Sequence, residues 1–86
     1  MASLSALGEI RILSDILLLQ EVVADYILNA AKLSESESHY RRRSIKAMIE
    51  TIEGRIFRIS ETSVAAALTE RLAGIVRALV IQILTE

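Results

Sequence analysis

The chain has 86 residues, of which 52% are hydrophobic and 24% are charged, and its formal net charge is −1. A chain of this length forms one domain, residues 1–86, and buries only about 60–65% of its unfolded surface. The mean hydropathy of +0.43 is therefore high for one small core, and the absence of cysteine excludes disulfides and thiolate metal sites.

The lack of proline and the presence of only three glycines predict an all-α fold. We expect an antiparallel arrangement of helices at about residues 4–33, 37–59 and 63–84. Between the first two, Ser34 and Glu37 have the spacing of a capping box. No glycine or proline marks the break near Ser60, so the alternative is a hairpin whose second arm bends there.

The first predicted helix is apolar around most of its circumference, and its polar residues form one narrow stripe. Three helices cannot cover this circumference and also hide the apolar face of the third helix. The sequence therefore predicts that oligomerisation completes the fold, as a homodimer or a higher oligomer. Acidic residues interrupt the helix at Asp15, Glu21 and Asp25, which argues against a transmembrane segment.

The second predicted helix is amphipathic and carries a row of small residues at spacings of three and four. A glycine inside a helix costs about 1 kcal/mol relative to alanine, so Gly54 in this row suggests that another backbone comes close. The row of small residues and apolar positions of the first and third helices together form the predicted interface. The row consists of Ser44, Ala47, Thr51 and Gly54, and the other interface residues are Leu17, Tyr26, Ile75 and Leu79.

Charge is distributed unevenly along the chain. Residues 1–39 carry six acidic and two basic side chains, whereas residues 40–58 carry six basic and two acidic ones. The simplest interpretation is that these segments neutralise one another, with Arg41 reaching an acid of the first helix. The alternative is a nucleic-acid contact at His39, Arg42 and Lys46, although consecutive helical residues diverge by about 100° and so do not form one phosphate claw.

No pattern in the sequence names a reaction, a metal or a cofactor. The only histidine is His39, and no cluster of potential ligands accompanies it. Glycine-rich phosphate loops and nucleophile motifs are also missing, because Gly8, Gly54 and Gly74 are isolated. We therefore expect no catalytic residues, no metal and no cofactor.

The run from His39 to Gly54, HYRRRSIKAMIETIEG, resembles a helix of HEPN-type domains. In that helix an arginine-rich start leads into small and apolar residues that include a glutamate. The resemblance implies a dimerising helical bundle of a defence or toxin-antitoxin system, with ribonuclease activity in members that carry an arginine a few residues before a histidine. This chain lacks that motif, because the only arginine before His39 is Arg11.

Two functional hypotheses follow. The favoured one is a non-catalytic assembly or partner-binding module, such as a small bacterial or phage regulator, that binds itself and another protein. The alternative is a HEPN-like RNA-associated protein of a defence or toxin-antitoxin system, with ribonuclease activity as one form of that hypothesis. Met1 is followed by serine and alanine without early basic residues, which argues against a secretory signal and favours a cytoplasmic location.

Overall fold

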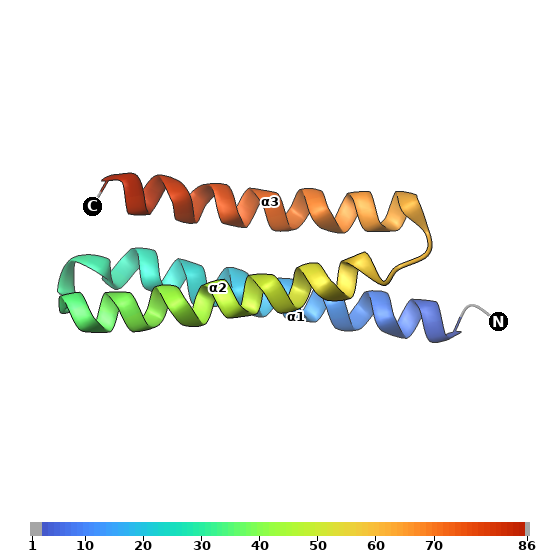
Figure 1. Cartoon of the computed structure of the whole chain (residues 1–86), viewed down its shortest axis with the longest axis horizontal. Helices are drawn as coiled ribbons and strands as arrows, with labels where there is room; N and C mark the ends of the chain where they lie inside the picture. Colours follow the sequence, from blue (N-terminus) through green and yellow to red (C-terminus); the bar gives the residue numbers. More distant parts are fainter. Residues whose placement is uncertain (1–2, 86) are drawn as a thin grey trace.

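The computed structural model describes the backbone of residues 3–85 and the side chains of residues 8–85. It contains α1 (Ser3–Asn29), a short 3-10 turn η1 (Ala30–Lys32), α2 (Glu35–Phe57) and α3 (Thr62–Thr85). The helices lie side by side in up-down-up order, with α2 antiparallel to α1 and α3 (Figure 1). The predicted all-α fold of three helices is confirmed, whereas the alternative of one bent second arm is wrong.

The core follows a seven-residue repeat. In α1 the buried positions alternate at spacings of four and three residues, which is the pattern of knobs-into-holes packing between nearly parallel helices. α2 and α3 each contribute a shorter set from the face that meets α1. The buried residues are Ile12, Ile16, Leu19, Val23 and Tyr26 of α1, Ile45, Ile52 and Ile56 of α2, and Leu68, Leu72 and Leu79 of α3.

The connection between α1 and α2 is fixed by the predicted capping box. The Ser34 side chain accepts a hydrogen bond from the Glu37 backbone N–H, and the Glu37 side chain accepts one from the Ser34 N–H. Acidic Glu35 and Glu37 also lie in the first turn of α2, where the helix dipole favours negative charge. Because Ser34 is the cap, α2 begins two residues earlier than residue 37.

The connection between α2 and α3 reverses the chain without any residue at positive φ. At the end of α2, the Arg58 N–H donates to the Arg55 carbonyl and the Ile59 N–H donates to the Ile56 carbonyl. These tighter bonds between residues three apart end α2. Glu61 then accepts from the Ala65 N–H at 3.0 Å as α3 starts. A reversal of this kind leaves no glycine or proline signal in the sequence.

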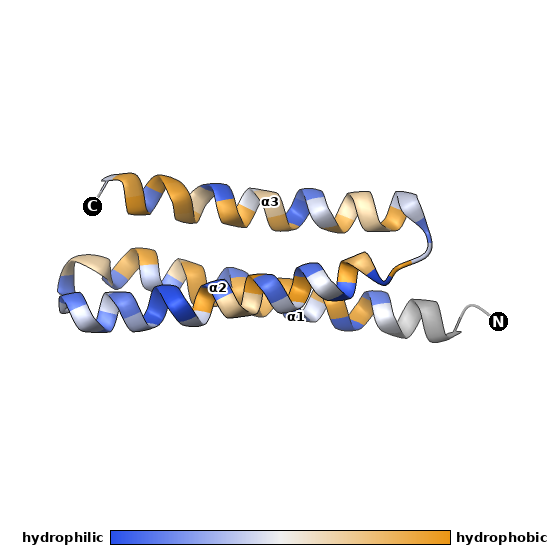
Figure 2. Ribbon diagram, in the orientation of Figure 1, coloured by the Kyte–Doolittle hydropathy of each residue, from blue (hydrophilic) through white to orange (hydrophobic). Residues whose placement is uncertain are grey.

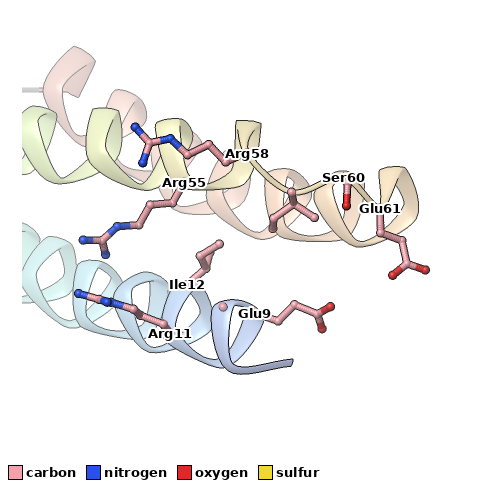
Figure 3. Close-up of a pocket in the computed structure, with 9 residues that line it drawn as sticks. Glu9, Arg11, Ile12, Arg55, Arg58, Ser60 and Glu61 are labelled. Carbon is pink, nitrogen blue, oxygen red and sulfur yellow. The ribbon is translucent and has the colours of Figure 1, made fainter. Parts of the chain in front are cut away.

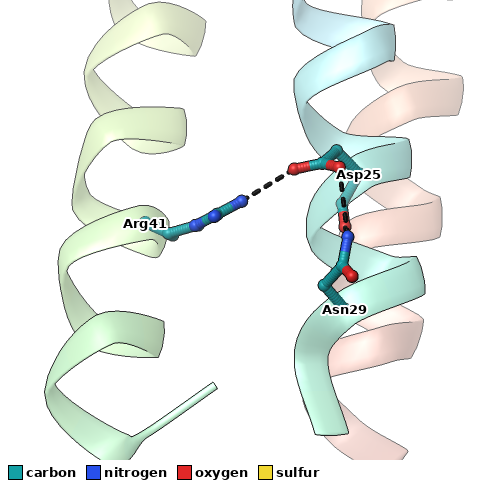
Figure 4. Close-up of polar contacts among 3 residues, drawn as sticks. All are labelled: Asp25, Asn29 and Arg41. Carbon is teal, nitrogen blue, oxygen red and sulfur yellow. Dashed lines mark hydrogen bonds and ion pairs between the residues drawn. The ribbon is translucent and has the colours of Figure 1, made fainter. Parts of the chain in front are cut away.

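Among the residues whose side chains are described, two ion pairs join α1 to α2. An Arg41 Nη donates to Asp25 Oδ2 at 2.8 Å, and Asn29 Nδ2 donates to the same carboxylate at 3.1 Å (Figure 4). Arg55 pairs with Asp15 further along the same seam, where both side chains are about one-third exposed. The expectation that Arg41 reaches an acid of the first helix is confirmed.

Truncation of a core residue tests this packing. Ile45 has no exposed surface, whereas Phe57, in the last turn of the same helix, is 89% exposed. Ile45→Ala should lower the free energy of unfolding by about 2–5 kcal/mol because it leaves a cavity. Phe57→Ala should change it by less than about 0.5 kcal/mol in the single chain. Urea denaturation followed by circular dichroism measures both, and equal losses would contradict the described core.

Candidate functional site

Nine large apolar side chains are exposed among the residues whose side chains the structure describes. They lie on all three helices, and α1 carries four of them. Figure 2 shows that hydrophobic residues are frequent along α3 and most dense near its C-terminal end. The nine are Ile10, Leu17, Leu18, Leu28, Tyr40, Phe57, Val80, Ile81 and Leu84.

The total surface is large for the mass of the chain. The accessible area is 6280 Å², whereas a monomeric globule of 9.5 kDa exposes about 5,000 Å². The radius of gyration is 14.4 Å, compared with about 12 Å for a compact domain of this length. The chain is a rod of 49 × 17 × 17 Å, and its surface exceeds that of a compact monomer by roughly 1,200 Å².

A largely apolar depression lies between α1 and α3. It has a volume of 530 Å³, and the only polar side chains along it are Gln20 and Arg71. Leu17 of α1 forms part of one wall, and Gly74 and Ala78 of α3 lie along the other. An apolar groove that combines large side chains with small residues suits an amphipathic helix. The full lining is Leu13, Ile16, Leu17, Gln20, Val23, Ala24, Ile27, Arg71, Gly74, Ile75 and Ala78.

The predicted row of small residues faces outward beside α1. Ser44, Ala47, Thr51 and Gly54 are all exposed, and a Cβ added to Gly54 would meet nothing within 4 Å. Ala47 and Thr51 line a shallow depression of 240 Å³ with Leu18 of α1. No described helix of the same chain therefore approaches Gly54 closely, and a close contact at Gly54 requires another molecule.

The other four predicted interface residues divide into two groups. Leu17 is exposed and Ile75 is half-buried, and both line the groove between α1 and α3. Tyr26 and Leu79 are buried in the core of the chain itself. The surface available to a second molecule does not include these two residues. The helical spacing of apolar residues in the sequence does not distinguish the face that packs in the core from the neighbouring face that lines the groove.

The candidate nucleic-acid residues lie at the start of α2. His39 and Arg42 line an open depression with Ser34, Glu35 and Ser36, and Arg42 Nε donates to the Ser38 carbonyl at 3.4 Å. Lys46 is exposed one turn further along the helix but does not line this depression. The structure thus brings His39 and Arg42 together, next to the negative charge of Glu35.

A second cleft, of 540 Å³, lies where α1 begins and α2 turns into α3. Arg11, Arg55 and Arg58 extend toward one end of it, whereas the carboxylates of Glu9 and Glu61 lie toward the other (Figure 3). Because Arg55 is paired with Asp15, three carboxylates balance the three guanidinium groups. No local sequence pattern indicates this cleft, since its residues come from two distant segments, 8–12 and 55–61.

No group of three or more metal-ligating side chains converges in the described part of the chain. None of the helices that the structure describes has the length and apolarity needed to cross a bilayer. In comparisons with known proteins, the chain matches no family, no curated protein and no solved structure. The site must therefore be judged from its own geometry.

Gly54 offers a direct test of the small-residue row. Because open space surrounds the position, Gly54→Ala should stabilise the chain by about 0.8–1 kcal/mol through helix propensity alone. Thermal unfolding of the purified protein measures the change. A loss of stability on this substitution would show that another backbone packs against Gly54, and Gly54→Leu should then disrupt that contact further.

Proposed function

We propose that this chain is a non-catalytic helical module that acts by binding protein through the exposed apolar surface of α1 and α3. The observation that carries the proposal is the groove between these helices, with Leu17 exposed on one wall and small Gly74 and Ala78 on the other. Contiguous apolar surface beyond what folding can bury marks a docking surface rather than a solvent-facing one.

The charge distribution also supports protein binding over nucleic-acid binding. Two arginines of α2 are engaged by carboxylates of α1, in the pairs Arg41–Asp25 and Arg55–Asp15. Nucleic-acid affinity depends on basic side chains that are free to neutralise phosphates. The pairing reduces the charge available for that purpose on the face that α2 shares with α1.

Nucleic-acid titration separates the proposal from the RNA-associated alternative. We expect no binding tighter than roughly 100 μM to single- or double-stranded RNA or DNA at 150 mM salt, which is the range of weak non-specific contacts. Fluorescence anisotropy across salt concentrations measures it. Micromolar binding that weakens steeply with salt, and that Arg42→Ala with Lys46→Ala removes, would contradict the proposal.

A positive test places a photoreactive amino acid at Leu17, in cells that make the protein naturally. Leu17 is exposed in the groove, so illumination should attach protein to it, either another copy of the chain or a different protein. The matched control is a photoreactive residue at Glu70, an exposed position of α3 that does not line the groove. Equal labelling at both positions, or labelling at neither, would contradict binding through this surface.

A further inference from the structure

We infer that the occupant of the groove between α1 and α3 is α1 of a second copy of this chain, docked antiparallel about a two-fold axis near Leu17 and Gln20. The inference rests on the proposed function and names the partner of that surface. In this arrangement each α1 lies in the other chain's groove, so that one contact occurs twice.

The exposed face of α1 has the pattern that the groove requires. Leu17 and Ala24 line the groove, and Ile10 and Leu28 are exposed just beyond its two ends. These positions recur at spacings of seven and four residues, so they form one stripe along the helix. The same stripe is thus both a wall of the groove and an apolar helix face able to fill a groove of this kind.

The small residues of α3 are placed to receive this stripe. α1 and α3 run in the same direction (Figure 1), and the groove pairs residues 13–27 of α1 with residues 71–78 of α3. A two-fold axis near Leu17 and Gln20 therefore brings the large side chains of the partner's α1 against Gly74 and Ala78. Small residues opposite large ones allow the close approach that ridges-into-grooves packing needs.

The same two-fold axis brings residues of opposite charge together at the edges of the interface. Glu21 lies on the outer edge of the α1 stripe, and Arg71 lies on the α3 wall of the groove. Both are exposed, and neither takes part in an ion pair within the described residues. Because the axis lies between Leu17 and Gln20, Glu21 of the partner subunit comes level with Ile16, toward the end of the groove where Arg71 lies. Two equivalent ion pairs then flank the axis.

The surface area is sufficient for a stable dimer. The chain exposes 6280 Å², roughly 1,200 Å² more than a compact monomer of its mass. A standard protein interface buries about 800 Å² from each partner. Burying one face of α1 and α3 therefore accounts for most of the excess and leaves the opposite face, with Leu18 and Gly54, open to solvent.

Neighbouring leucines provide a matched test. Leu17 is 55% exposed in the groove, and Leu18 is 53% exposed on the α2 side of the same helix. Sedimentation velocity should show a wild-type dimer of twice 9.5 kDa. Leu17→Glu should raise the dissociation constant of the dimer by about 30-fold or more, as expected for a central apolar contact present twice. Leu18→Glu should change it by less than about threefold.

A charge exchange tests the register and does not depend on the leucine variants. Glu21→Arg and Arg71→Glu should each weaken the dimer by about three- to tenfold, because each puts like charges together at two places. The chain that carries both substitutions should recover most of the wild-type affinity. Far-ultraviolet circular dichroism verifies that every variant remains helical.

Several outcomes would overturn the inference. A wild-type chain that remains a monomer at about 100 μM would exclude a second copy as the occupant, and so would dimers that Leu18→Glu breaks and Leu17→Glu does not. A double charge variant that is weaker than either single variant would exclude the antiparallel register. The proposed function fails separately, when photocrosslinking at Leu17 attaches no protein, whereas attachment of a different protein to a monomeric chain defeats only the present inference.

Discussion

The structure depends on the burial of α1, which brings more apolar surface than its two neighbours can cover. Its inner side supplies five of the core residues, and Ile10, Leu17, Leu18 and Leu28 remain exposed on its other sides. Hydrophobic burial is the main favourable term in folding. A chain of 86 residues buries a smaller fraction of its surface than a larger domain does, so its margin of stability is small. The fold and the proposed activity therefore share one cause, since the surface proposed to bind protein is part of the apolar surface that folding leaves uncovered.

Ion pairs help to set how neighbouring helices are aligned, which apolar packing alone does not specify. Within the chain, Asp25 and Asp15 of α1 hold Arg41 and Arg55 of α2. Exposed pairs such as Arg41–Asp25 contribute only about 0.2–1 kcal/mol each, so their main effect is on the register of the two helices. The seam that they occupy faces away from the groove, because Asp15 and Asp25 lie on the α2 side of α1 and the apolar stripe lies on its α3 side.

Much of the fold was predictable from local sequence. Hydrophobic periodicity and the absence of proline predicted the three helices. The spacing of Ser34 and Glu37 predicted the capping box. The reversal after Phe57 was ambiguous because it uses neither glycine nor positive φ. Tyr26 and Leu17 both lie on the broad apolar side of one helix, so the three-dimensional position of α3 was needed to assign Tyr26 to the core and Leu17 to the groove. The cleft around Arg11 and Arg58 joins distant segments, which no local pattern reveals.

The concentration dependence of thermal unfolding tests most directly whether association completes this fold. If it does, mass action links unfolding to dissociation, and a 100-fold increase in protein concentration adds about 2.7 kcal/mol to the stability of the folded state. For a dimer of this size the unfolding midpoint should rise by roughly 5–10 °C across that range. A cooperative transition whose midpoint is independent of concentration, in a chain that sediments at 9.5 kDa, would contradict the account.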